Sequence, residues 1–243
     1  MSDKSLKVLK VKDFKKVEHP LDKDLNERGK FLFPIHPYFN ITCAAPRQGK
    51  TNLLINKIFG THMYNGQDYW DTIYYISPSQ MHDQTCCHIL PKFDNVIRIH
   101  EVEDIMNLKS ILENIVKEQK DLIKKDEPLE RILIVLDDCV SFLNPVAVLS
   151  TKYRHVGLSF EINVQSFRSC PLLIRNCASS LTFFKLHNTK EMEKIDEEFG
   201  QNYTKDFIPM VEDATSEKYN FVFMNHDKMI MYKNFDEVLV DAT

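Results

Sequence analysis

Glycine is scarce in this sequence: only six of the 243 residues are glycine and ten are proline. This composition argues against long flexible linkers, which are rich in glycine. No stretch reaches the roughly 18 consecutive apolar residues of a membrane-spanning helix, and the first residues lack the apolar core of a secretory signal. We therefore expect a soluble, intracellular protein without membrane insertion.

The six cysteines do not follow the spacing of an extracellular disulfide framework, and this favours a reducing compartment. The net charge of −4 argues against a protein that coats nucleic acid through bulk charge, although a channel lined with basic side chains is still compatible with it. A chain of this length can bury a sizeable core without disulfides or metals.

Residues 1–30 are rich in charge and have weak periodicity, so they are interpreted as an arm or peripheral segment, and 31–243 as one domain. Apolar patterns predict strands that alternate with helices along this domain, which indicates an α/β fold with a mainly parallel sheet. The predicted strands are 38–43, 71–76, 95–100, 131–138, 158–164 and 181–186, and the main helices are 49–58, 103–125 and 191–199. Two further apolar runs, 219–224 and 229–232, predict a C-terminal antiparallel hairpin.

The segment from Ala44 to Thr51 follows the phosphate-loop pattern Gly-x-x-x-x-Gly-Lys-Ser/Thr, except that Ala44 replaces the first glycine. A methyl group is tolerated there if the turn does not require a positive φ. Backbone N–H groups would bind the phosphates, Lys50 would neutralise their charge, and the Thr51 hydroxyl would bind Mg²⁺. The alternative is a turn that contains Gly-Lys-Thr by chance. The predicted nucleotide-binding residues are Ala45, Pro46, Arg47, Gln48, Gly49, Lys50, Thr51 and Asn52.

Two acidic residues, Asp137 and Asp138, end the aliphatic run 131–138. Asp137 would hold the Mg²⁺ of a bound nucleotide through water, and Asp138 would orient and polarise the attacking water as catalytic base. The alternative is a solvated acidic strand end. Gln165 follows the next predicted strand, and its amide could both donate to a γ-phosphate and accept from water. This pattern predicts ATP hydrolysis with catalytic roles for Lys50, Asp138 and Gln165.

These motifs together resemble the FtsK/HerA superfamily of P-loop motors, and within it the poxvirus-type DNA-packaging ATPases of large DNA viruses and virophages. The resemblance covers roughly 36–190 and is carried by the stretches Ala45–Thr51, Ile134–Asp138, Arg154–Ser159, Gln165–Arg168 and Pro171–Asn176. It implies a three-layer, RecA/ASCE-like P-loop NTPase fold and a homo-oligomeric ring, a hexamer, that packages double-stranded DNA into a preformed capsid. It also implies contacts with capsid proteins, and a location in the host cytoplasm, a virus factory or the virion.

Rings of this kind also need an arginine that stabilises charge on the transferring phosphoryl group, often from the neighbouring subunit. We favour Arg154 for this catalytic role over Arg168, Arg175 and Arg47, while a surface salt bridge is the alternative for each of them.

Three other interpretations of the function stay open. They are a cellular HerA-like or conjugative DNA translocase, a nucleotide-dependent assembly switch without motor activity, and a small-molecule kinase. The short chain without an appended DNA-binding region favours the viral motor over the cellular or conjugative translocase. The acidic pair with Gln165 argues against the assembly switch. No arginine-rich lid follows the phosphate loop, which argues against the small-molecule kinase.

The segment Cys86-Cys87-His88 could suggest a zinc site, but no second ligand pair follows at the usual spacing, so a packing role is favoured.

Overall fold

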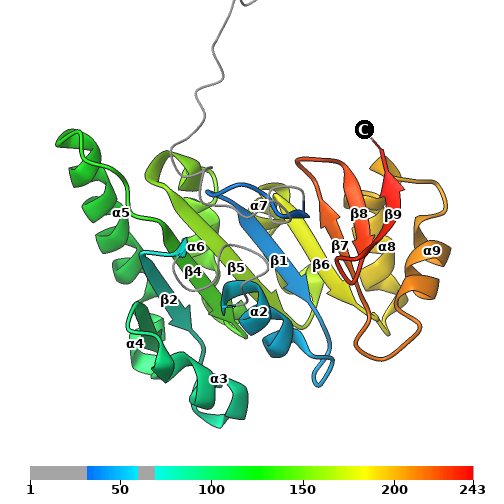
Figure 1. The fold of residues 1–243 in the computed structure, drawn as a ribbon, viewed down its shortest axis with the longest axis horizontal. Helices are drawn as coiled ribbons and strands as arrows, with labels where there is room; N and C mark the ends of the chain where they lie inside the picture. The colour runs from blue at the N-terminus through cyan, green and yellow to red at the C-terminus, as the bar shows by residue number, and fades with distance from the viewer. Residues whose placement is uncertain (1–31, 60–68, 243) are drawn as a thin grey trace, which may run out of the picture.

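The computed structural model describes residues 32–59 and 69–242, and these form a single sheet with helices on both faces (Figure 1). The predicted arm, 1–30, lies outside the described residues. The described strands are β1 (Phe39–Cys43), β2 (Thr72–Ile76), β3 (Val96–Ile99), β4 (Ile132–Asp137), β5 (Leu158–Val164), β6 (Ser180–Phe184), β7 (Phe221–Asn225), β8 (Ile230–Lys233) and β9 (Glu237–Asp241).

The sheet has the strand order β3-β2-β4-β5-β1-β6-β7-β8-β9. The first six strands in this order are parallel, and β7, β8 and β9 extend the sheet in antiparallel fashion. The predicted mainly parallel α/β sheet and the C-terminal hairpin, which is β7 and β8, are therefore confirmed. The last strand, β9, was not predicted. It pairs with β8, and the hairpin is therefore part of a three-stranded antiparallel extension.

The described α-helices are α2 (Lys50–Phe59), α3 (Gln84–Ile89), α4 (Val102–Met106), α5 (Leu108–Lys124), α6 (Asn144–Leu149), α7 (Leu172–Asn176), α8 (Thr189–Glu198) and α9 (Phe207–Ala214). The prediction of one helix over 103–125 was wrong, because the chain breaks at Asn107. The side chain of Asn107 donates a hydrogen bond to the Glu103 carbonyl oxygen at 3.0 Å, which ends α4 before α5 begins.

Two apolar cores, one on each face of the sheet, give the three layers that the resemblance implied. In one core, side chains of α5 and of α9 pack with the strand residues Ile134, Phe160 and Ile41. The other joins α2 and α3 with Leu133 and Val135, and Figure 1 shows α2 in front of the central strands. All residues of β4 are buried, as the unbroken aliphatic run predicted for a parallel strand covered on both faces.

Beneath α2 the packing is polar as well as apolar. Lys57 of α2 is buried and forms an ion pair with Glu161 of β5, with Nζ–Oε distances of 2.7 and 2.8 Å. Glu161 also accepts hydrogen bonds from the Tyr38 hydroxyl and from Asn40 Nδ2, at 3.0 and 2.6 Å. This network fixes the phosphate-loop helix to the two central strands β1 and β5.

The turn after β7 holds a largely buried histidine, His226. Its Nδ1 lies 2.9 Å from the Tyr203 hydroxyl, and its ring stacks on Phe199 at 4.5 Å. Burial lowers the pKa of His226 to about 4, below the value of about 6.5 in an unfolded chain. The folded state therefore favours the neutral ring.

We expect His226 to weaken the fold in acid. As the pH falls from about 6.5 to about 4, the unfolded chain takes up a proton that the folded chain does not, so up to about 3 kcal/mol of stability is lost. The neighbouring Asp227, whose pKa is raised by burial, acts in the opposite direction. Urea unfolding of wild type and His226→Gln between pH 4 and 7 measures the difference. Parallel pH profiles for the two proteins would contradict the assignment.

Candidate functional site

The phosphate loop joins β1 to α2, and its backbone explains why alanine can replace the first glycine. Ala44 is buried, has no positive φ and donates its amide hydrogen to the Val164 carbonyl oxygen at 3.1 Å. The left-handed positions are Arg47, with φ 66°, and Gly49, with φ 93°. A Cβ atom at Gly49 would lie 3.3 Å from the Tyr219 ring, so both its backbone and its surroundings favour glycine.

Lys50 is the first residue of α2 and lies against the acidic pair. Its ammonium is 2.5 Å from Asp138 Oδ1 and 3.6 Å from Asp137 Oδ1. Gln165 donates a hydrogen bond from Nε2 to the same Asp138 oxygen at 3.4 Å. Because β1, β4 and β5 are parallel, the segments that follow them meet at the carboxyl edge of the sheet, where α/β proteins bind ligands.

The two aspartates have different surroundings. Asp137 ends β4 and is buried, and it accepts hydrogen bonds from Asn163 Nδ2 at 3.0 Å and from the Tyr75 hydroxyl at 3.2 Å. Burial raises the pKa of Asp137, while Lys50 and Asn163 act to lower it. Asp138 has φ 56° and a partly exposed side chain. One carboxylate is therefore held in place and the other is accessible to water.

A cleft of about 410 Å³ opens beside these groups. It is lined by Ala45, Pro46, Arg47, Gly49, Lys50, Thr51, Asn52, Asp83, Thr85, Asp138, Gln165 and Tyr219. Seven of the eight predicted nucleotide-binding residues are among these. The eighth, Gln48, donates from Nε2 to the Lys185 carbonyl oxygen at 2.9 Å and lines an adjoining pocket. Asp137 does not line the cleft.

The residues predicted to bind a metal carry suitable donor atoms. The Thr51 hydroxyl and the Asp137 carboxylate are hard oxygen ligands of the kind that Mg²⁺ binds, usually together with water and substrate phosphates. Thr51 lines the cleft, and Lys50 approaches both carboxylates of the pair beside it. In addition, Asn163 Oδ1 is buried next to Asp137 and forms no hydrogen bond among the described residues. This donor set fits Mg²⁺.

The structure places the four candidate arginines differently. Arg154 lies in the 3₁₀ helix Tyr153–Val156, just before β5, at the amino edge of the sheet and away from the phosphate loop. Its side chain is 62% exposed, contacts Asp227 at 3.9 Å and donates to the Tyr153 hydroxyl at 2.9 Å. Arg154 therefore cannot serve the phosphate loop of its own chain.

The other arginines lie nearer to the carboxyl edge or are already engaged. Arg175 is buried and forms an ion pair with Glu198 at 3.0 Å, so it fastens α7 to α8. Arg168 lies three residues beyond Gln165 and is exposed, and within the described part of the chain its guanidinium forms no ion pair. Arg47 is an exposed residue of the phosphate loop itself.

Sequence reasoning missed several residues that shape this site. Asn163 and Glu161 left a signal, because polar residues alternate with apolar ones along β5 although the whole strand is buried. Tyr75 and Lys57 gave no signal, since an aromatic residue in a strand and a lysine in a helix are ordinary in sequence. Tyr219 lies in the loop between α9 and β7, where no pattern points to a ligand.

The Cys86-Cys87-His88 segment lies in α3. Cys86 is buried, with its sulfur 3.2 Å from the Tyr75 hydroxyl, whereas Cys87 and His88 are exposed. In the described ranges, 32–59 and 69–242, there is no group of three or more His, Cys, Asp or Glu side chains that could hold a metal ion. Through Cys86, this segment packs α3 against β2, whose Tyr75 donates a hydrogen bond to Asp137. Within the same ranges no helix is long and apolar enough to cross a bilayer.

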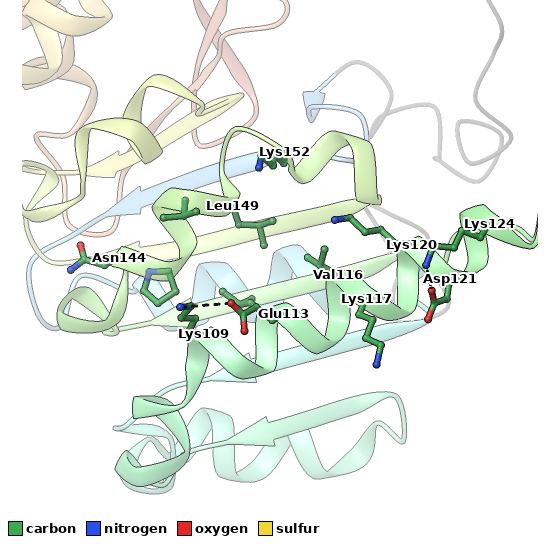
Figure 2. Close-up of a pocket in the computed structure, with 13 residues that line it drawn as sticks. Lys109, Glu113, Val116, Lys117, Lys120, Asp121, Lys124, Asn144, Leu149 and Lys152 are labelled. Carbon is green, nitrogen blue, oxygen red and sulfur yellow. Dashed lines mark hydrogen bonds and ion pairs between the residues drawn. The ribbon is translucent and has the colours of Figure 1, made fainter.

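A larger groove, of about 730 Å³, lies between α5 and α6. Figure 2 shows Val116 of α5 and Leu149 of α6 on facing walls, with Lys120 on the α5 side, Lys152 beyond the end of α6, and Lys117 pointing away. None of its lining residues lines the cleft at the phosphate loop. The groove is therefore separate from the nucleotide site.

Comparison with known proteins shows similarity only at the level of structure. No family model and no curated protein matches this chain. The genome-packaging NTPase B204 of Sulfolobus turreted icosahedral virus 2, solved in complex with sulfate, matches with a TM-score of 0.58 and 10% identity. The match covers 82% of this chain and 96% of B204.

Two further solved structures have the same fold. The cytoplasmic domain of the Thermomonospora curvata Type VII secretion ATPase EccC matches with a TM-score of 0.55 and 14% identity, over 78% of this chain and 24% of that one. The pCW3 conjugation coupling protein TcpA matches with a TM-score of 0.52 and 13% identity, over 85% of this chain and 60% of that one. This chain therefore has the same P-loop NTPase-like α/β fold as these proteins.

Proposed function

We propose that this chain is an ATP-hydrolysing motor that translocates double-stranded DNA and packages a viral genome into a preformed capsid. The observation that carries the proposal is the convergence of Lys50, Asp138 and Gln165 on one cleft at the phosphate loop. A phosphate-binding lysine, an accessible carboxylate and an amide that contacts it are the groups that in-line attack of water on a γ-phosphate requires.

Each residue then has a defined role in hydrolysis. Amides of the phosphate loop and Lys50 hold the β- and γ-phosphates, while Asp138 orients the attacking water and accepts its proton. Thr51 and Asp137 would hold Mg²⁺, Asp137 through water, and the ion would supply neutralisation of phosphate charge. Gln165 reports the γ-phosphate to β5, whose Glu161 is tied to Lys57 of the phosphate-loop helix.

We propose further that the chain acts as a homo-oligomeric ring, a hexamer, in which Arg154 serves the site of the neighbouring subunit. Support comes from its position at the amino edge of the sheet, where it is exposed and far from its own phosphate loop. Subunits that carry Arg154→Ala can be mixed with subunits that carry Asp138→Asn. Regained hydrolysis in the mixture supports an arginine acting across the interface, and no hydrolysis after confirmed co-assembly contradicts it.

The motor function is tested by measuring ATP turnover with and without double-stranded DNA, using Lys50→Ala as the blank for contaminating activity. We expect turnover to rise severalfold with DNA. Turnover that is real but indifferent to DNA at every concentration would contradict translocation while leaving ATP hydrolysis in place.

A second candidate is a conjugative or HerA-like cellular translocase, favoured by the fold shared with the conjugation coupling protein TcpA. Both candidates predict stimulation by DNA, and specific binding to capsid proteins distinguishes the viral motor. A nucleotide-dependent assembly switch predicts ATP binding without DNA-stimulated turnover.

A further inference from the structure

The cleft at the phosphate loop continues into a second pocket of about 360 Å³. The walls common to both are Ala45, Pro46, Arg47 and Tyr219. The second pocket is otherwise lined by Gln48 and Phe184, by Lys185 and His187 after β6, and by the loop 216–220 before β7. Because neither Asp138 nor Gln165 lines it, this pocket lies away from the end of the cleft where the γ-phosphate is attacked. It is therefore available to the nucleoside part of a bound nucleotide.

Tyr219 has an unusual backbone and an exposed ring at the junction of the two pockets. Its φ is 72°, a left-handed conformation that is rare for a bulky side chain, and its side chain is 56% exposed. The surrounding turn is held firmly: the Asn220 amide donates to the Glu217 carbonyl oxygen at 3.3 Å, and Asn234 Nδ2 donates to the Asn220 side-chain oxygen at 2.8 Å. The loop thus holds an aromatic ring outward beside Gly49 without burying it.

The side chains around the Tyr219 ring suit a planar ring system that is attached to an anionic group. The ammonium of Lys218 lies 4.6 Å from the centre of the Tyr219 ring, and the exposed Lys185 and His187 line the same pocket. An exposed aromatic face can stack on any base, since every base has a π face. The adjacent phosphate loop supplies the site for the anion.

We propose that Tyr219 is the stacking platform for the base of the nucleotide, and that the second pocket holds the base and ribose. This inference rests on the proposed function, because it takes ATP as the ligand of the phosphate loop. It assigns Tyr219 to nucleoside recognition, separately from the residues that bind phosphate.

The test compares binding of ATP with binding of inorganic tripolyphosphate, both with Mg²⁺, to wild type, Tyr219→Asn and Tyr219→Phe. Asparagine tolerates a left-handed backbone, so Tyr219→Asn removes the ring without adding strain. We expect Tyr219→Asn to weaken ATP binding at least about 5-fold, the lower end of the contribution of one stacked base, and to leave tripolyphosphate binding unchanged. Tyr219→Phe should keep the affinity of wild type for ATP.

The outcomes separate this inference from the proposed function. If wild type binds neither ligand, the proposed function fails and the inference fails with it. If wild type binds ATP and Tyr219→Asn binds it equally well, only the stacking role is overturned. An equal loss of ATP and tripolyphosphate binding in Tyr219→Asn also overturns it, because the ring would then support the phosphate loop instead of the base.

Discussion

Replacing Asp138 with asparagine will lower the rate of ATP hydrolysis at least about 100-fold, while ATP binds at least as tightly as to wild type. Asparagine keeps the left-handed backbone at φ 56° but cannot accept a proton from water. Binding survives because Lys50 pairs with Asp138 at 2.5 Å, so a γ-phosphate competes with this carboxylate for the ammonium. Removal of the charge ends that competition. Single-turnover hydrolysis and equilibrium ATP binding measure the two effects separately.

Two variants control this experiment. Lys50→Ala should lose ATP binding as well as turnover, because the ammonium that neutralises the phosphates is gone. Asp126→Asn makes the same chemical change at an exposed left-handed position, φ 59°, beyond the end of α5, and should leave both quantities unchanged. Wild-type turnover in Asp138→Asn would show that Asp138 is not the catalytic base.

Replacing Lys57 with methionine will lower the free energy of unfolding by about 3–5 kcal/mol. The variant leaves the carboxylate of Glu161 buried, and within 32–59 and 69–242 the remaining donors to it are the Tyr38 hydroxyl and Asn40 Nδ2. For a chain of this size the loss corresponds to a fall in Tm of roughly 10 °C. Urea and thermal unfolding measure it.

A double variant and a surface variant separate the buried pair from general effects. Lys57→Met combined with Glu161→Met removes both charges, so it should regain part of the stability that Lys57→Met loses. Lys109→Met breaks an exposed ion pair with Glu113 and should leave the unfolding midpoint nearly unchanged. A midpoint for Lys57→Met close to that of wild type would show that the buried pair contributes little to the fold.

The phosphate loop and the central strands could be predicted because their signals are local. Gly49, Lys50 and Thr51 follow a predicted strand at the spacing that phosphate binding requires, and the aliphatic run 131–138 is long enough to identify a buried parallel strand. The meeting of Asp138 with Lys50 also follows from sequence, since parallel strands bring their carboxyl ends to one edge. The geometry at that edge then supports the predicted roles.

Other features depend on contacts between distant residues, which sequence periodicity does not report. The break at Asn107 was invisible because apolar residues recur at a helical spacing on both sides of it. The short strand β9 follows a turn in which Asn234 and Phe235 both have positive φ, and no glycine marks that turn. Tyr219 belongs to the site only because the loop before β7 passes beside Gly49.

The position of Arg154 has a consequence for symmetry. On the proposal that this arginine completes the site of another copy, the contact joins the amino edge of one subunit to the phosphate-loop edge of the next, and these are two different surfaces. Such a heterologous contact repeats in one direction and either closes into a ring or continues as a filament. A dimer with twofold symmetry joins identical surfaces and would complete neither site. A closed ring completes one site for each subunit, whereas an open row always leaves one terminal site without its arginine.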